Sequence, residues 1–87
     1  MLLDLLTPEG KIFSGNVYGV QMPGVTGSFE VLDKHAPMIA ALREGRLKIL
    51  EEKLSGGRES FYNIQGGFVE VIDNKITVLV EGAVEAR

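Results

Sequence analysis

The chain contains no cysteine and only one histidine, His35. Without cysteine, a disulfide framework and a zinc site built on thiolates are both excluded. One histidine is too few for the multi-histidine metal site of a β-sandwich metalloenzyme. Lys and Arg number 9 against 12 Asp and Glu, which gives a net charge of −3. This acidic balance argues against a nucleic-acid binder, which needs a basic face.

Long apolar runs are also missing. A membrane-spanning helix needs about 20 consecutive apolar residues, whereas apolar stretches such as residues 76–80 are short. The first residues include Asp4 and lack the basic start of a signal peptide, so we expect none. The 87 residues are 45% hydrophobic, which is enough for one small folded domain over residues 1–87.

The hydrophobic pattern has a period of two rather than 3.6, which indicates strands rather than helices. We expect strands over residues 2–6, 11–13 continuing as 17–22, 29–32, 38–42, 46–49, 60–64, 68–72 and 76–80. Turns are expected at residues 7–10, 43–45, 65–67 and 73–74, where Gly, Pro, Asn or Asp gather. This pattern predicts an all-β domain, an antiparallel β-sandwich or flattened barrel of about eight to ten short strands.

Three patterns that resemble functional motifs favour ordinary structural roles. Gly56-Gly57 and Gly66-Gly67 precede no helix carrying Lys and Ser or Thr, so we predict hairpin loops there and not phosphate-binding loops. The carboxylates of Glu51 and Glu52 adjoin a polar loop and are expected to be solvated. Five of the six aromatic residues are expected to pack in the core or on a sheet face and not to stack on nucleic acid; they are Tyr18, Phe29, Phe61, Tyr62 and Phe68.

Residues 24–37 are the most specific stretch of the chain, with two glycines, the single histidine and Pro37. The pattern predicts a loop, a short strand, a corner at residues 33–37 and then the next strand. Ala36 precedes proline and is therefore expected to be extended. We expect His35 to bond nearby backbone and fix the corner. The stretch offers no nucleophile–base pair and suits a binding surface better than an active site.

Several segments, in order, resemble the N-terminal β-sandwich domain of the epsilon subunit of F-type ATP synthases, the counterpart of the mitochondrial delta subunit. They are residues 3–10, 13–15, 24–37, 45–49, 66–71 and 74–79, so the resemblance covers essentially the whole chain. The chain departs from the family at Glu30, where members often have Gly, and at Asp33-Lys34, where they often have Pro-Gly.

The resemblance implies a non-catalytic central-stalk subunit that links the gamma subunit to the membrane c-ring and supports coupling of proton flow to ATP synthesis. It implies no cofactor, and a peripheral place on the cytoplasmic face of the bacterial inner membrane. The residues that match the gamma-facing segment are Thr7, His35, Ala36, Pro37, Met38, Ile39 and Ala40. The residues that match the c-ring loop are Val25, Thr26, Gly27, Ser28, Phe29 and Glu30.

Most family members continue into a C-terminal helical hairpin, which inhibits ATP hydrolysis and in some members binds ATP. Residues 83–87 would form only about 7.5 Å of helix, so we expect these 87 residues to bind ATP weakly at most and not to inhibit by inserting a helix. Whether Arg87 is the natural end stays open. Two alternatives remain, a β-sandwich enzyme and a free-standing ligand-binding module that would not co-purify with gamma.

Overall fold

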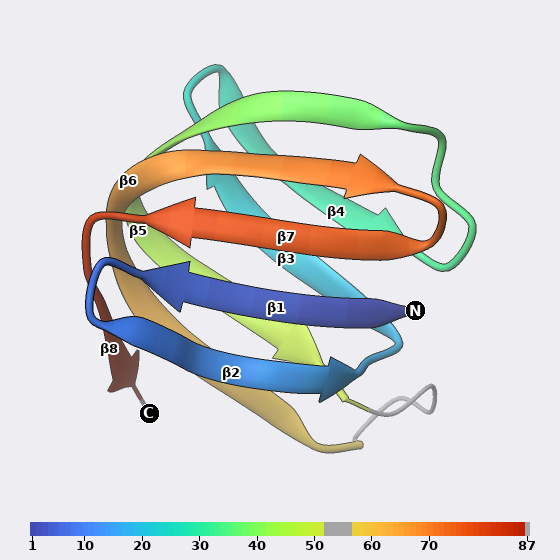
Figure 1. Cartoon of the computed structure of the whole chain (residues 1–87), viewed down its shortest axis with the longest axis horizontal. Coiled ribbons are helices and arrows are strands. Elements are labelled where there is room, and N and C mark those ends of the chain that lie inside the picture. The colour runs from blue at the N-terminus through green and yellow to red at the C-terminus, as the bar shows by residue number, and fades with distance from the viewer. Residues whose placement is uncertain (52–56, 87) are drawn as a thin grey trace.

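The computed structural model describes residues 1–51 and 57–86 and gives them eight β-strands and no helix (Figure 1). The prediction of an all-β fold is confirmed, and nothing in the described part of the chain is a helix fit to cross a membrane. The strands are β1 (Leu2–Thr7), β2 (Gly10–Asn16), β3 (Gly19–Gly24), β4 (Gly27–Leu32), β5 (Met38–Leu50), β6 (Glu59–Ile72), β7 (Lys75–Val80) and β8 (Ala83–Ala86).

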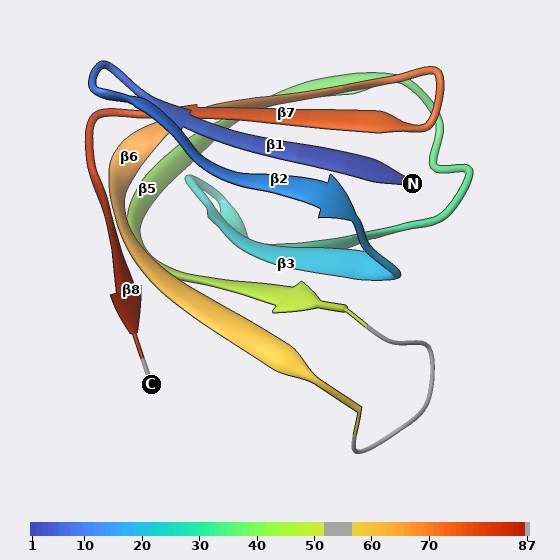
Figure 2. The ribbon, with the colours of Figure 1, turned by 60° about the horizontal axis from the view of Figure 1, so that its bottom comes forward.

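The strands pair as one continuous sheet in the order β2-β1-β7-β6-β5-β3-β4, and β8 pairs with β6. The sheet folds into two facing layers because β5 and β6 bend and take part in both (Figure 2). One layer combines β2, β1 and β7 with the second half of β6 and the first half of β5. The other combines β8 with the first half of β6, the second half of β5, β3 and β4. Within the described residues, all pairings are antiparallel except that of β1 with β7. β5 and β6, which belong to both layers, thus join the two layers of the sandwich.

The bend replaces two predicted turns, and those predictions were wrong. Residues 43–45 and 65–67 lie inside β5 and β6, where Glu44 still pairs with Gln65. Gly66 and Gly67 have φ angles of 82° and 148°, which residues with a side chain rarely adopt. The two glycines therefore redirect β6 sharply while the chain stays in the sheet.

A third correction concerns residues 11–22, where one interrupted strand was predicted. β2 instead continues through Asn16, and the break falls at Val17 and Tyr18. The Val17 backbone N–H donates to the Met1 carbonyl and the Tyr18 N–H donates to the Leu50 carbonyl, both at 2.8 Å. These bonds satisfy the backbone where the chain crosses from one layer to the other.

Three further features complete the comparison with the predicted elements. The turn at Asp73 and Asn74 is confirmed, with φ angles of 50° and 60°. β8 was not predicted, because four residues with one large apolar side chain give too weak a pattern. The loop predicted around residues 55–57 and the Glu52 carboxylate lie largely outside the described residues.

The core lies between the two layers and contains only apolar side chains among the described residues. In the first layer, paired positions form inward rows: Val71 opposite Ile76, which is opposite Leu3, and Val69 opposite Val78, which is opposite Leu5. Because strand side chains alternate, the intervening positions of these strands point outward. That outward face is available for contacts with other molecules.

Candidate interaction surfaces

The tight β3–β4 turn and the start of β5 enclose a hollow of about 510 Å³. Gly24 pairs with Gly27 across Val25 and Thr26, and a Cβ added at Gly24 would lie 2.6 Å from the Gly27 carbonyl oxygen. The Val25 N–H donates to the Ala41 carbonyl at 3.1 Å and so ties the turn to β5. The hollow is lined by Gly24, Val25, Thr26, Gly27, Ser28, Phe29, Met38, Ala40 and Ala41.

The two predicted contact sets therefore adjoin at this hollow. Met38 and Ala40 come from the predicted gamma segment, and Val25, Thr26 and Phe29 are among the predicted c-ring residues. Glu30 is exposed on β4 and is not among the residues that line the hollow. Sequence reasoning treated the two sets as separate surfaces, and their meeting depends on the β3–β5 pairing.

The corner before β5 carries His35, Ala36 and Pro37, and all three are exposed. The His35 Nδ1 atom lies 2.7 Å from the Ala36 carbonyl oxygen. The His35 N–H donates to the Leu32 carbonyl at 3.2 Å and closes the turn. The prediction that the imidazole bonds nearby backbone is confirmed.

Ile39 points away from its neighbours Met38 and Ala40, to the outside of the sandwich, and is 72% exposed. It lines a second hollow of about 360 Å³ together with Pro37, Met38, Glu70, Val71 and Ile72. The predicted gamma segment is therefore split between the two faces of β5, since Met38 and Ala40 pack partly against the core.

Thr7 lies apart from the other predicted gamma residues, at the end of β1. Its hydroxyl donates to the Gly10 carbonyl at 3.4 Å and accepts a hydrogen bond from the Glu9 N–H at 3.2 Å. Thr7 lines a third hollow of about 340 Å³, with Pro8, Gly67, Phe68, Leu79, Val80 and Glu81. Within the described part of the chain, Thr7 lines neither of the two hollows to which residues 37–41 contribute.

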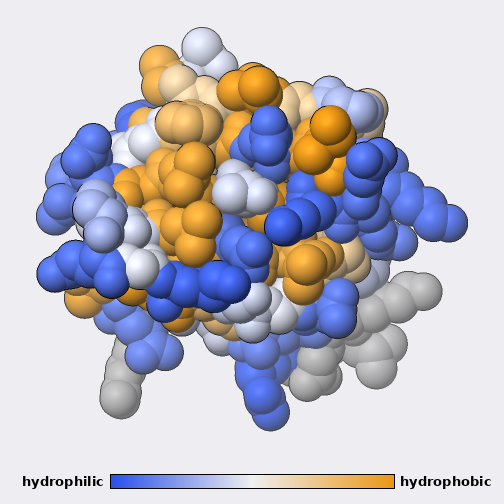
Figure 3. Space-filling view, viewed as in Figure 1, coloured by the Kyte–Doolittle hydropathy of each residue, from blue (hydrophilic) through white to orange (hydrophobic). Residues whose placement is uncertain are grey.

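Sequence reasoning missed a broader feature, the apolar outer face of the first layer. Its exposed large apolar side chains include Leu2, Ile39, Phe68, Ile72 and Leu79. Figure 3 looks onto this face and shows apolar patches separated by polar groups. The signal was present in β7, because a strand that is apolar at consecutive positions has apolar side chains on both faces.

A polar row crosses the same face. Glu70 pairs with Thr77, Thr77 pairs with Asp4, and Asp4 pairs with Ser14. The Ser14 hydroxyl donates to the Asp4 carboxylate at 2.6 Å, and the Lys75 ammonium lies 3.7 Å from it. The hydrogen bond from Ser14, with smaller effects of the two nearby lysines, holds the pKa of Asp4 below its usual value. Between its apolar areas the outer face thus carries a charged carboxylate that Ser14 holds in place and that Lys11 and Lys75 flank.

No group of three or more His, Asp or Glu side chains that would suit a metal ion occurs in residues 1–51 and 57–86. No Asp, Glu, His, Lys or Arg side chain is buried in the described chain. The phenol of Tyr62 lies in the core, and its burial raises its pKa. The hollows and the exposed apolar side chains described above are features typical of contact surfaces.

Comparison with known proteins identifies a protein family to which this chain is similar. A model of the β-sandwich domain of ATP synthase delta and epsilon chains matches residues 1–86. The ATP synthase epsilon chain of Caulobacter vibrioides is 44% identical over 83 residues, which are 95% of this chain and 92% of that protein. The epsilon chain of Anaeromyxobacter sp. (strain K) is 43% identical over 83 residues, but these are only 60% of its length.

Solved structures show the same fold. A chain of the Euglena gracilis mitochondrial ATP synthase (OSCP/F1/c-ring) aligns over 98% of this chain with a TM-score of 0.88 and 26% identity, using 52% of its own length. A chain of the Tetrahymena thermophila mitochondrial ATP synthase central stalk/c-ring aligns with a TM-score of 0.82 and 21% identity, which is a likeness of fold alone. The chain thus spans about half to two-thirds of these structures and about 60% of several relatives, such as the Anaeromyxobacter protein.

Proposed function

Because the chain belongs to the delta/epsilon-chain β-sandwich family of ATP synthases, we propose that it is a non-catalytic subunit of the central stalk of an F-type ATP synthase. In this role it joins the gamma subunit to the membrane c-ring and supports coupling of proton flow to ATP synthesis. The observation that carries the proposal is the 44% identity with the Caulobacter vibrioides epsilon chain across 92% of that protein.

The surface geometry supports a linking role. The residues proposed for gamma, His35, Ala36, Pro37, Met38, Ile39 and Ala40, follow the corner into β5, while Thr7 lies at a separate hollow. The residues proposed for the c-ring, Val25, Thr26, Gly27, Ser28, Phe29 and Glu30, lie on the neighbouring β3–β4 hairpin. One rigid sheet therefore carries both proposed contact surfaces side by side, so a force applied at one is passed directly to the other.

The outer face gives the gamma contact a physical basis. Ile39 is 72% exposed and stands beside Ile72, which is 48% exposed. Covering large apolar side chains releases about 25 cal/mol per Å² of apolar surface, and a partner that covers this hollow gains that stabilisation. We also infer from the bacterial relatives that the complex lies on the cytoplasmic face of the bacterial inner membrane, with this chain as a peripheral subunit.

Co-purification and a coupling assay test the proposal together. The chain should purify with a tagged gamma subunit, and inverted membrane vesicles that lack it should hydrolyse ATP with little proton pumping. Adding the chain back should restore pumping. A chain that neither binds gamma nor changes coupling would contradict the stalk function and would favour the free-standing ligand-binding module instead.

A further inference from the structure

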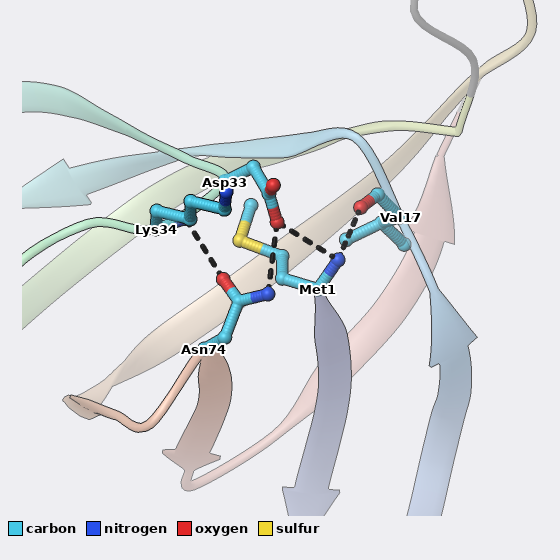
Figure 4. Close-up of polar contacts among 5 residues, drawn as sticks. All are labelled: Met1, Val17, Asp33, Lys34 and Asn74. Carbon is cyan, nitrogen blue, oxygen red and sulfur yellow. Dashed lines mark hydrogen bonds and ion pairs between the residues drawn. The ribbon is translucent and has the colours of Figure 1, made fainter.

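Three distant segments meet at the corner that precedes β5 (Figure 4). The Lys34 backbone N–H donates to Asn74 Oδ1 at 2.8 Å, across 40 residues of sequence. Asn74 Nδ2 in turn donates to Asp33 Oδ1 at 2.9 Å. A single asparagine side chain therefore holds two residues of the corner, Lys34 through its amide oxygen and Asp33 through its amide nitrogen.

Asn74 is itself held firmly. It occupies the two-residue β6–β7 turn with Asp73, and the φ angles of 50° and 60° are those of a type I′ hairpin turn. Its carbonyl accepts a hydrogen bond from the Leu2 N–H at 3.2 Å, which ties the turn to β1. The side-chain amide of Asn74 thus reaches the corner from a turn that is held by the β6–β7 pairing and by β1.

The corner needs such support because its backbone is strained. Lys34 has a φ of 63°, a left-handed conformation that is unfavourable for a residue with a side chain. Asp33 also lies 3.4 Å from the Met1 ammonium, which is 3.3 Å from the Val17 carbonyl oxygen. The hydrogen bond from Asn74 is the main reason why the pKa of Asp33 is lowered, so its carboxylate stays charged in this network.

We propose that Asn74 is a positioning residue for the gamma contact: it fixes Asp33 and Lys34 and thereby sets how residues 35–37 enter β5. Ile39 itself is held by its pairing with Glu70, so Asn74 acts on the part of the gamma segment that precedes β5, up to Pro37 in the hollow beside Ile39 and Ile72. This inference rests on the proposed function, since it takes gamma as the partner of residues 35–40. Asn74 is not among the residues that the family resemblance implies for either partner.

Two designs separate the side chain from the turn. Asn74→Gly removes both hydrogen bonds, but glycine accepts the positive φ and Asp-Gly is favoured in a type I′ turn. The exchanged pair, Asp33→Asn with Asn74→Asp, restores both bonds with the roles reversed, but it removes the ion pair between Asp33 and the Met1 ammonium. The carboxylate at position 74 then accepts from the Lys34 N–H and from the amide at position 33.

Two measurements are made on each full-length variant: affinity for the catalytic complex that contains gamma, and hydrogen exchange of the Lys34 amide by NMR. For Asn74→Gly we expect about 30-fold weaker binding, because two net hydrogen bonds of about 1 kcal/mol each no longer order the corner. The Lys34 amide should also exchange faster. The exchanged pair should bring both values back toward those of the parent, although not fully because the ion pair with the Met1 ammonium is lost. A mere loss of stability would not be reversed by the second substitution.

Ile39→Asp distinguishes the inference from the proposed function. If the Lys34 amide exchanges no faster in Asn74→Gly than in the parent, Asn74 does not hold the corner. If the amide is released and gamma affinity is unchanged while Ile39→Asp weakens binding, Asn74 does not position the contact. If Ile39→Asp leaves binding intact, the proposed gamma surface fails, and the exchange data alone then decide whether Asn74 holds the corner.

Discussion

Gly67 lies so close to Leu79 that a Cβ added to the glycine would stand 2.0 Å from the Leu79 carbonyl oxygen. The same Cβ would be 2.7 Å from the Cα of Val80. Backbone atoms cannot move aside as a flexible side chain can, and Gly67 also has a φ of 148°. This glycine therefore allows β6 to bend while it remains paired with β7.

We expect Gly67→Ala to lower the free energy of unfolding by roughly 3 kcal/mol or more, since it combines backbone strain with overpacking. Gly10→Ala is the matched control, because Gly10 has a φ of 131° and no atom of the described residues lies within 4 Å of the added Cβ. That variant should lose only about 1–2 kcal/mol from strain. Denaturant unfolding measures both, and equal losses would show that the contact with Leu79 is not the cause.

The Ser14–Asp4 hydrogen bond predicts a pH dependence. The folded-state pKa of Asp4 is lowered from 3.8, first by Ser14 and less by Lys11 and Lys75, against desolvation that raises it. A lowered pKa adds stability above the unfolded value, and this is lost as the pH falls through the folded value. Ser14→Ala should therefore raise the pKa of Asp4 toward its ordinary value, as a carbon-13 NMR titration would measure.

The stability profile gives a second reading of the same bond. The difference in unfolding free energy between the parent and Ser14→Ala should be largest above about pH 5 and shrink below about pH 4. Ser28→Ala, at an exposed position of β4, is the control and should not shift the Asp4 titration. An Asp4 pKa that does not change in Ser14→Ala would contradict the assignment.

The strands and their inward faces were largely predictable from the sequence because one face of each strand is buried. The period of two fits β3, where Val20 and Met22 are buried and Gln21 between them is exposed. The confirmed turn at Asp73 and Asn74 carries its own chemical signal, since both residues tolerate positive φ. Strand faces and this turn could be predicted because each depends on residues that are close together in the sequence.

The bend in β5 and β6 was not predictable from such rules. Gly66 and Gly67 signal unusual φ angles, but a hairpin turn and a bend within a strand require the same residues. The choice depends on pairing with β5 and β7, which is a long-range property. For the same reason, the meeting of Val25 with Ala40 at one hollow appears only once β3 lies beside β5.

The proposed c-ring contact predicts a salt-dependent effect at Glu30. Glu30 is exposed on β4, so Glu30→Lys should leave the fold intact within about 0.5 kcal/mol. If Glu30 faces a basic group of the ring, the reversed charge should reduce proton pumping per ATP hydrolysed in vesicles. The defect should be greater at low salt, because the Debye length shortens from about 30 Å at 0.01 M to about 10 Å at 0.1 M.

Glu85→Lys provides the control for Glu30, with the same change in charge at an exposed position on β8. It should leave pumping unchanged at every salt concentration. Parental coupling of Glu30→Lys across the whole salt series would remove Glu30 from the proposed c-ring surface.

The proposed gamma contact makes its sharpest prediction at Ile39. Because this side chain is 72% exposed, Ile39→Asp should change the free energy of unfolding by no more than about 0.5 kcal/mol. In a complex the new carboxylate would be buried against apolar surface without a partner, at a cost of about 2–3 kcal/mol. We therefore expect roughly 30- to 150-fold weaker binding to the gamma-containing complex by titration calorimetry.

Val84 supplies a matched control for Ile39, since it is also a β-branched apolar residue and is 65% exposed, but it lies on β8. Val84→Asp makes the same change of polarity and charge in the other layer of the sandwich. It should leave gamma affinity within about twofold of the parent, because a charge in solvent adds almost no cost. Equal weakening by both variants would mean that net charge, and not the surface around Ile39, governs binding to gamma.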